Sequence, residues 1–344
     1  MKKLSITTVS LAALALSCVQ PAVAGFDNTF VDFAGSDSAN TCGVITSPCA
    51  TLNNALANTN ATGSVNILNG GFWGPILITQ SVNINAFEGK AVIINDGSAP
   101  GCVGAAAGSC GSNGGYAIEI AGTTSTNVKM KGVSIRQGTG SGGALKIGTA
   151  NQVKLADSNL RGSSSATLPM LDIVPANGNA PTQFQLVLAN VDVAYSAGAA
   201  IRVLPSGSTA VRLLADRLQV HNASAGIRLD ASSLTGSGNI VGSVSNSFFF
   251  SFQNAGINVV APSGANKAAF GSAKSVFTNV GGQGLRAIGA GASVALSDDV
   301  VTGNNIGIQA VTSGTIVTFK NNSVGGNAVD FDTAGGTVIP ITPF

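Results

Sequence analysis

The sequence predicts an all-β right-handed parallel β-helix, a solenoid with three strands per coil. Three observations predict it. A short alternating segment recurs at a mean spacing of about 26 residues, two further strand-like segments lie between successive copies, and the repeats show no helical periodicity. A leucine-rich repeat would require a fixed Leu and Asn frame, and a propeller would require a longer repeat. The chain length then gives about eleven coils.

The first strand of each coil is a four-residue segment whose second and fourth residues are apolar. Its copies are Ala117–Ile120, Ala144–Ile147, Met170–Ile173, Ala200–Val203, Gly226–Leu229, Gly256–Val259, Gly284–Ala287, Gly307–Ala310 and Ala328–Phe331. Their third residues should form one solvent-facing row, which we call the polar row: Glu119, Lys146, Asp172, Arg202, Arg228, Asn258, Arg286, Gln309 and Asp330. The small first residues of the copies predict a flat floor beside this row.

A turn column should separate the second strand of each coil from the third. Small or Asx residues recur two positions after the end of the second strand: Gly132, Asp157, Asn190, Asp216, Asn246, Ser272, Asp298 and Asn321. Such residues tolerate a left-handed backbone or bond to their own turn, so we expect a sharp corner at this position in every coil.

The ends of the solenoid require caps, because an open coil exposes core and unpaired strand edges. We expect a signal peptide over residues 1–24, an N-terminal cap with a disulfide loop and a short helix over 25–62, the β-helix over 63–335 and a tail over 336–344. Leu52, Ala55 and Leu56 share one helical face that would cover the first coil. Pro340 and Pro343 would end strand pairing in the tail.

Export is predicted by the first 24 residues. Lys2 and Lys3 precede an apolar stretch over about residues 4–16, and small residues end it before Gly25. Cys18 offers the alternative of a lipoprotein cysteine, although Ala15 stands where a larger aliphatic residue is expected. No later apolar run has the ~18 residues that a membrane span needs. Location in the periplasm, at the cell surface or outside the cell stays open.

Charge argues against two classes of partner. The whole chain has a net charge of +2, with 17 basic and 15 acidic residues, and loss of Lys2 and Lys3 leaves 15 of each. A neutral protein has no field with which to gather nucleic acid or anionic lipid.

The cysteines that follow the leader form two close pairs, Cys42 with Cys49 and Cys102 with Cys110. In an exported chain this spacing predicts two local disulfides. A metal site is the rival reading, but the sequence has no C-x-x-C motif and its single histidine is His221. We therefore expect neither a metal nor a cofactor.

Several segments resemble the secreted pectin-lyase-like β-helix proteins. The segment 47–56 and the following 63–68 look like their opening, in which a Cys-loop and a short amphipathic helix cap the first coil. Residues 127–135 resemble their second and third strands, and 302–308 and 325–329 resemble their late coils. The resemblance covers residues 27–335. It implies the fold and a substrate groove along the first sheet, but not an activity, because this superfamily has members with many different functions.

The residues for catalysis in that groove are scarce. A lyase would need clustered carboxylates for calcium, and the first sheet offers only Glu119 and Asp172, with Lys146 between them. Asp298 and Asp299 resemble the paired aspartates of pectin hydrolases, yet Asp298 belongs to the turn column. His221 does not lie in the Gly-His-Gly element of such hydrolases, so we expect a loop residue.

The sequence thus favours a non-catalytic exported protein that binds polysaccharide or the cell surface, or has a structural role. The candidate ligand-binding residues are Lys146, Asp172, Arg202, Arg228, Arg286 and Trp73. Arginines of the row would take glycan carboxylates in bidentate fashion, and Trp73 would offer a ring from a glycine-rich loop. The rival interpretation treats the row as an ordinary solvated surface and Trp73 as packing. The alternative function is a divergent polysaccharide lyase or glycoside hydrolase that uses Lys146, Asp172, Arg202 and Arg228. The oligomeric state stays open.

Aromatic residues other than Trp73 are assigned to the interior. Phe248, Phe250, Phe270 and Phe277 lie at strand positions suited to stacking inside the coil.

Overall fold

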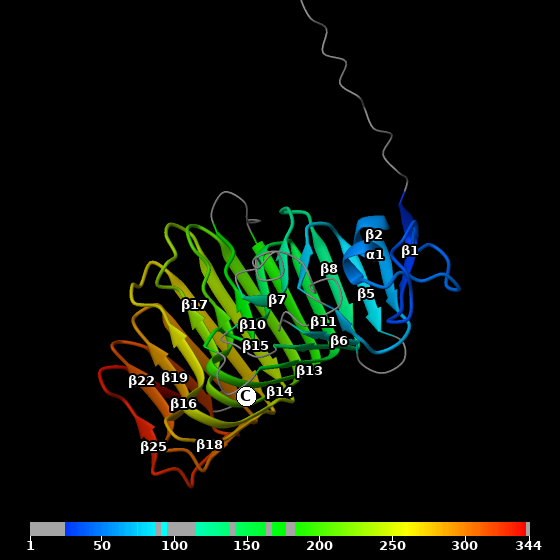
Figure 1. Ribbon diagram of the computed structural model, residues 1–344. Helices are drawn as coiled ribbons and strands as arrows, with labels where there is room; N and C mark the ends of the chain where they lie inside the picture. Colours follow the sequence, from blue (N-terminus) through cyan, green and yellow to red (C-terminus); the bar gives the residue numbers. More distant parts are fainter. Residues whose placement is uncertain are drawn as a thin grey trace, which may run out of the picture.

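The computed structural model describes residues 25–73, 75–86, 91–94, 115–137, 142–162, 167–176 and 183–341. The predicted signal peptide, Cys18, Cys102, Cys110 and Pro343 lie outside these ranges. The chain winds as one continuous stack of coils from α1 (Leu52–Asn58) and β1 (Phe26–Val31) at one end to β25 (Val329–Asp332) at the other (Figure 1).

Every coil contributes to three parallel stacks of strands. The first stack contains β4 (Ile76–Ile78), β7 (Tyr116–Ala121), β10 (Gly143–Thr149), β12 (Leu171–Ile173), the last parts of β13 (Gln183–Val203), β14 (Ala210–Asp230) and β16 (Phe248–Val260), then β19 (Gln283–Ile288), β22 (Ile306–Val311) and β25. The second stack contains β1, β2 (Thr59–Ile67), β5 (Val82–Ala86), β8 (Asn127–Lys131), the first parts of β11 (Gln152–Arg161), β13 and β14, then β15 (Asn239–Ser245), β17 (Lys267–Ala273), β20 (Ala292–Ser297), β23 (Thr315–Phe319) and β26 (Thr337–Ile341). The third stack contains β3 (Phe72–Trp73), β6 (Ala91–Ile94), β9 (Val133–Arg136), the remaining parts of β11, β13, β14 and β16, then β18 (Val276–Val280), β21 (Val300–Thr302) and β24 (Ser323–Val324).

This arrangement confirms the predicted right-handed parallel β-helix with three strands per coil. Within the described residues, the first stack has ten strands in unbroken succession, slightly fewer than the eleven coils expected. Each interior strand is hydrogen-bonded above and below, at the ~4.8 Å spacing of neighbouring strands.

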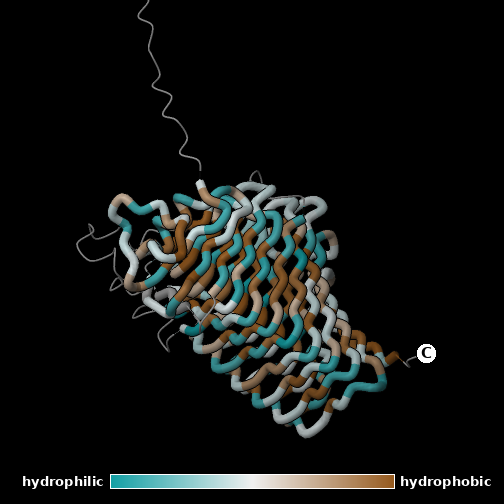
Figure 2. Tube along the Cα trace, turned by 90° about the vertical axis from the view of Figure 1, so that its right-hand side faces the viewer, coloured by the Kyte–Doolittle hydropathy of each residue, from teal (hydrophilic) through white to brown (hydrophobic). Residues whose placement is uncertain are grey.

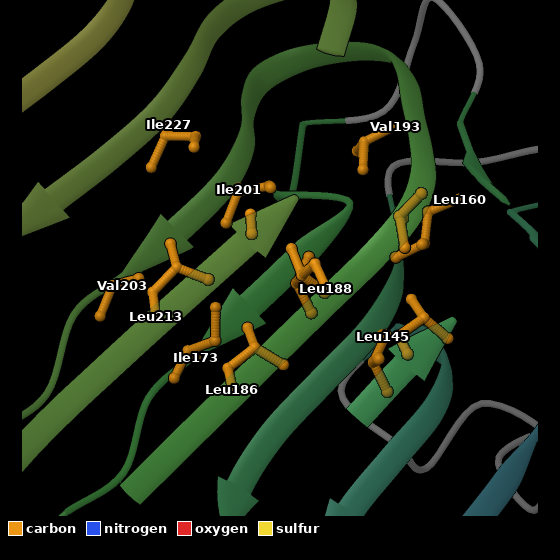
Figure 3. Close-up of a cluster of buried hydrophobic side chains, with 14 of the residues drawn as sticks. Leu145, Leu160, Ile173, Leu186, Leu188, Val193, Ile201, Val203, Leu213 and Ile227 are labelled. Carbon is orange, nitrogen blue, oxygen red and sulfur yellow. The ribbon is translucent and has the colours of Figure 1, made fainter. Parts of the chain in front are cut away.

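The core runs along the axis of the solenoid. Apolar and polar residues alternate along the strands, so the hydropathy colouring forms stripes across successive coils (Figure 2). Figure 3 shows the inward side: Leu145, Ile173, Ile201 and Ile227 come from successive first strands and point toward side chains of the other two stacks. These four are fully buried. Neighbouring coils thus bury each other's apolar faces, which one coil alone cannot do.

The helix α1 caps the first coil as predicted. Its N-cap is Thr51, whose hydroxyl accepts a hydrogen bond from the Asn54 amide at 3.2 Å. Leu52, Ala55 and Leu56 are its buried residues, and they join the core beneath it.

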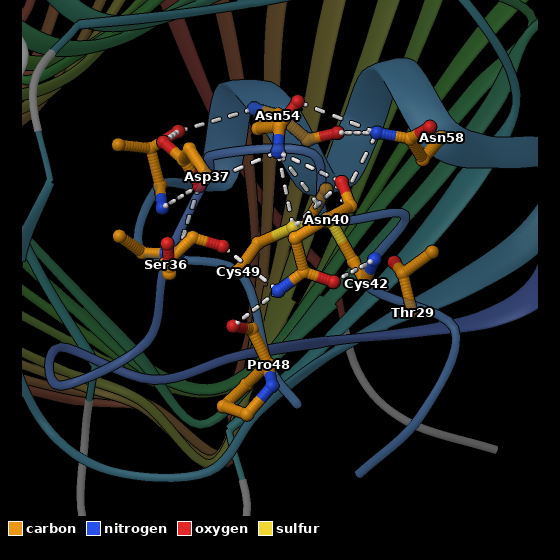
Figure 4. Close-up of a disulfide and its surroundings, with 12 residues drawn as sticks. Thr29, Ser36, Asp37, Asn40, Cys42, Pro48, Cys49, Asn54 and Asn58 are labelled. Carbon is orange, nitrogen blue, oxygen red and sulfur yellow. Dashed lines mark hydrogen bonds between the residues drawn. A yellow bond between two sulfur atoms is a disulfide. The ribbon is translucent and has the colours of Figure 1, made fainter. Parts of the chain in front are cut away.

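The loop between β1 and α1 contains a disulfide between Cys42 and Cys49, which confirms one of the two predicted bridges (Figure 4). The Asn40 side chain lies beside it and donates to the carbonyl oxygens of Ser47 and Pro48 at 3.0 and 2.8 Å. The Asp37 carboxylate accepts from the Thr51 amide and hydroxyl, so it ties the loop to the start of the helix.

The corner between the second and third stacks has a left-handed backbone in coil after coil. The residues with positive φ at this aligned position are Gly132, Asp157, Asn190, Arg217, Asn246, Lys274 and Asp298. The predicted column is wrong at Asp216, Ser272 and Asn321, whose φ values are not positive. The inward positions before two of these corners hold small residues, Ala215 and Ser272, so the hydrophobic pattern placed the end of the strand too early.

Strand pairing continues past residue 335, where the tail was expected to begin. Within that segment β26 pairs with β23, and Pro340 lies opposite Thr318. Proline is tolerated there because β26 is the last strand of its stack among the described residues, and an edge strand does not need every N–H.

Candidate functional site

The polar row exists as one continuous ladder on the first stack. Successive pairs in register are Glu119 with Lys146, Lys146 with Asp172, Asp172 with Arg202, Arg202 with Arg228, Arg228 with Asn258, Asn258 with Arg286, and Arg286 with Gln309. The last member is Asp332, which pairs with Gln309, so the expected Asp330 was wrong. The final first strand is Val329–Asp332, and Phe331 stacks on Ile308, two residues later than the repeat suggested.

The N-terminal half of the row is neutralised by its own ion pairs. Lys146 Nζ lies 2.8 Å from Glu119 Oε1. Arg202 binds Asp172 in bidentate fashion, with Nε to Oδ1 and Nη2 to Oδ2 both at 2.8 Å. The hydroxyl of the buried Tyr116 donates to Asp172 Oδ2, also at 2.8 Å. These groups therefore satisfy one another across neighbouring coils.

The protonation of this cluster is fixed by burial and by the same contacts. Burial raises the pKa of the Tyr116 phenol far above its usual value, and the charge of Asp172 raises it further. The hydrogen bond to Asp172 raises the pKa of Arg202. Tyr116 is thus a neutral phenol and Arg202 a cation near neutral pH.

Arg228 has a partner on its own strand. Its Nε and Nη2 lie 3.1 and 2.6 Å from Asp230 Oδ2, and the Ser232 amide donates to Asp230 Oδ1 at 3.0 Å. Burial opposes ionisation of Asp230, but the bonds from Ser232 and Arg228 outweigh it and lower the pKa of this carboxyl. The Arg228 side chain is 45% exposed, so it is held at one end and open to solvent.

Beyond Arg228 the row changes character. Three buried polar atoms on consecutive coils have no hydrogen-bond partner among the described residues: Asn258 Oδ1, Arg286 Nε and Gln309 Oε1. No carboxylate of the described chain lies within ion-pair distance of Arg286. Buried polar atoms are nearly always satisfied in folded proteins, so three such atoms in register set this half of the row apart from the paired N-terminal half.

A groove of about 590 Å³ lies beside Asn258 and Arg286 but is not lined by Gln309, and we call it the Arg286 groove. Arg228, Asn258 and Arg286 line it on the side of the row, and Ser224, Gln253 and Asn254 add hydroxyl and amide groups. The groove thus combines two guanidinium groups with neutral hydrogen-bonding groups.

The floor of the groove differs from the floor that the sequence predicted. Its small residues are Ala199, Ala225 and Ala255, which lie in register on β13, β14 and β16. The predicted column lies one residue later and is buried, because irregular register before each strand shifts the alternation. At Gly226 an added Cβ would lie 2.2 Å from the carbonyl oxygen of Gly256, so this column packs against the next coil.

The six ligand-binding candidates predicted from the sequence therefore do not lie in one site. Arg228 and Arg286 line one groove, whereas Lys146, Asp172 and Arg202 pair within the N-terminal half of the row. Trp73 lies apart: its side chain is 2% exposed, and its Nε1 donates to the Ala50 carbonyl at 3.2 Å beneath the cap. Sequence reasoning placed Asn258 and Gln309 in the row but did not single them out. Their only signal was membership of the row next to Arg286.

Aromatic residues of the third stack also differ from expectation. Phe270 and Phe277 are buried as predicted, but Phe248 is 40% exposed, and Phe249 between Phe248 and Phe250 is the buried one. In a run of three phenylalanines, the sequence does not show which of them point into the core and which point outward. Phe250 stacks on the ring of His221 at 4.8 Å, and His221 Nε2 lies 3.1 Å from Asp192 Oδ1.

Comparison with known proteins supports the fold. No family model matches the chain, and no curated protein matches its sequence. The solved structure of pectate lyase Pel9A matches with a TM-score of 0.57 and 13% identity, over 90% of this chain and 77% of that one. The chain has the pectate-lyase fold. Pectin methylesterase PemA from Erwinia chrysanthemi matches with a TM-score of 0.44 and 12% identity, over 91% and 92% of the two chains.

Two further observations concern metal-binding side chains and membrane-spanning helices. In the ranges that the structure describes, no three His, Cys, Asp or Glu side chains gather as metal ligands would. Across the same residues, no helix has the length and hydropathy that crossing a bilayer requires.

Proposed function

We propose that the protein is an exported binding module for an acidic polysaccharide, held without turnover in the Arg286 groove. The observation that carries this proposal is the groove that Arg228 and Arg286 line, where the buried atoms Asn258 Oδ1 and Arg286 Nε have no hydrogen-bond partner among the described residues. A protein that had evolved only for stability would pair or replace such atoms, since each unmet hydrogen bond costs about 1–3 kcal/mol.

The chemistry of the groove favours a carboxylated sugar chain. A guanidinium group matches a carboxylate with two parallel hydrogen bonds, and Arg286 has no ion pair with any carboxylate of the described residues. The Ser224 hydroxyl and the Gln253 and Asn254 amides line the same groove and are groups that can exchange hydrogen bonds with sugar hydroxyls. Because these groups lie on successive coils, a polymer that runs along the rod axis would meet them one after another.

Export is supported by two features. The Cys42–Cys49 disulfide is typical of proteins in an oxidising compartment, and the predicted signal peptide has the expected arrangement of charge and apolar residues.

The alternative is a divergent polysaccharide lyase or glycoside hydrolase. Its chemistry would have to come from Lys146, Asp172, Arg202 and Arg228, and each of these groups has an ion-pair partner within the protein. Tyr116 is an unsuitable base because its pKa is raised. These contacts favour binding over turnover.

Arg286→Ala tests the proposal. We expect the purified protein to bind oligogalacturonate and the variant to bind it about tenfold more weakly or worse, since a charged hydrogen bond contributes about 1.5–3 kcal/mol. Isothermal titration calorimetry measures the affinities. Arg212→Ala is the matched control, because Arg212 is an exposed arginine of the second stack with no ion pair in the described chain.

The same preparations should be assayed for unsaturated uronate and for new reducing ends. Turnover that Arg202→Ala or Arg228→Ala abolishes would replace the binding proposal with the enzymatic alternative. Equal affinity of wild type and Arg286→Ala would show that the row is only surface.

A further inference from the structure

A second group of cations lies on a different face of the rod. Lys129 of β8 and Lys154 of β11 occupy the same position of neighbouring second-stack strands, so their backbones are about 4.8 Å apart. Lys131 points to the same side two residues further along β8, and Arg217 follows at the corner of β14. The chain thus concentrates positive charge on the outer face of its N-terminal coils.

In the part of the chain that the structure describes, carboxylates compensate this group only at its margin. Lys131 lies 3.9 Å from Asp157, and Arg217 lies 3.6 Å from Asp216. Neither Lys129 nor Lys154 has an ion pair or hydrogen bond to any residue that the structure describes. Like charges directly opposite each other on neighbouring strands destabilise a sheet. Two unpaired lysines in register therefore work against folding, and an anion bound between them would remove that cost.

These cations line a groove of about 430 Å³. Among the described residues, its wall includes Lys129, Lys131, Lys154 and Arg217 and one carboxylate, that of Asp157, and Asn83 and Asn85 supply amides. An adjoining groove of about 360 Å³ shares Asn83 and Lys129 with it and is otherwise lined by neutral groups such as Thr62, Ser81 and Gln152. The two grooves together form a cationic centre with an uncharged polar extension.

The polar extension has acceptor atoms to spare. Asn83 uses its amide N–H groups on the carbonyl oxygens of Thr62 and Gly63, and Gln152 donates to Gln185. The Oδ1 atom of Asn83 and the Oε1 atom of Gln152 accept no hydrogen bond within the described chain. Such oxygens suit the hydroxyl groups of a sugar.

We propose that this second-stack groove binds a phosphorylated saccharide, with its phosphate between Lys129 and Lys154 and its sugar ring over Asn83 and Gln152. A phosphate monoester carries nearly two negative charges at neutral pH and three strong acceptor oxygens, which fits several convergent ammonium groups better than one carboxylate does. Lysine ammonium groups bind phosphate as point charges, whereas the planar guanidinium of Arg286 suits carboxylate. The site is separate from the Arg286 groove in both residues and ligand chemistry.

The double variant Lys129→Ala/Lys154→Ala tests this site. Calorimetric titration uses three probes: pentamannose with one 6-phosphate, the same pentamannose without phosphate, and inorganic phosphate. Wild type is expected to bind the phosphorylated sugar at least tenfold more tightly than either other probe. The double variant should lose that preference, Lys154→Arg should retain most of it, and high salt should weaken it.

Lys267→Ala is the matched control, because Lys267 is an exposed second-stack lysine outside the groove. Thermal unfolding shows whether the double variant has lost its binding site or its fold. Without ligand, its unfolding midpoint should be no lower than that of wild type, because the repulsion between the two lysines is removed. Arg286→Ala should bind the phosphorylated sugar with wild-type affinity, because Arg286 lies outside this groove. The second-stack site can therefore be tested even if the proposal for the Arg286 groove fails. Equal affinity for both pentamannoses, or undiminished affinity in the double variant, would overturn the site. If wild type bound inorganic phosphate as tightly as the phosphorylated pentamannose, the proposal that the ligand is a saccharide would be overturned.

Discussion

At the scale of single residues, Asp299 shows how a carboxylate serves the fold. It lies just after the corner column, is 1% exposed, and accepts hydrogen bonds from the Ser275 and Ser297 amides and the Ser272 hydroxyl. Its own amide donates to Asn322 of the next coil. Burial nevertheless raises the pKa of Asp299 to about 6. The carboxyl is thus a bridge between coils that is destabilised when it ionises.

This predicts a pH dependence of stability. Because the pKa of Asp299 is higher in the folded protein than the ~3.9 of an unfolded chain, its contribution is fully present below about pH 4 and is lost as pH rises through about 6. The difference in stability between wild type and Asp299→Asn should therefore change by about 2–3 kcal/mol across that window. Urea unfolding at several pH values measures it.

Asp298→Asn is the control, since Asp298 is the exposed neighbour that bonds to Asn321 at the surface. Parallel pH profiles of wild type and Asp299→Asn would contradict the role given to burial at this residue.

At the scale of elements, the corner between the second and third strands imposes its own backbone. Arg217 and Lys274 adopt left-handed φ values of 52° and 53° although neither is Gly, Asn or Asp. The coils above and below fix the path of the chain at this point, so the residue conforms to the corner. The left-handed region costs an ordinary residue about 1–2 kcal/mol relative to its preferred conformations.

Replacing lysine by glycine should therefore raise the stability of the protein at one position and lower it at another. Lys274→Gly, at the corner, is expected to raise stability by about 0.5–1 kcal/mol, because glycine adopts positive φ without strain. Lys267→Gly, at the first residue of β17, should lower stability by less than the about 0.5–1 kcal/mol of a strand interior, because glycine loses more conformational freedom on folding. The midpoints of thermal unfolding should shift in opposite directions, and shifts of the same sign would refute the explanation of the corner.

The sequence predicted the strands well wherever a large apolar residue showed which positions point inward. First strands such as Leu145–Ile147 and Ile201–Val203 stack in the expected register. The prediction failed where inward positions hold small residues, as Ala215 and Ser272 do before two corners, or where three phenylalanines in a row hide the phase. Alternation alone also does not reveal the irregular register that moved the floor of the groove by one residue.

At the scale of the whole molecule, the rod presents two polar faces with different chemistry. Low charge follows from an architecture in which one face of each strand is buried, so the cations without an ion pair in the described chain are conspicuous. The sequence identified the first-stack row in the correct register from Glu119 to Gln309 but gave equal weight to all its charges. Only side-chain geometry separates the paired groups around Asp172 and Arg202 from the unsatisfied ones around Arg286, because both sets have the same spacing along the chain.

The central claim is that an acidic glycan lies intact along the Arg286 groove. A crystal structure of the protein with oligogalacturonate tests it most directly. We predict an uncleaved oligomer on the first stack, with a carboxylate in contact with the Arg286 guanidinium and sugar hydroxyls in contact with Ser224, Gln253 or Asn254. An oligomer bound on another face, or a cleaved product beside Arg202 and Arg228, would contradict the account.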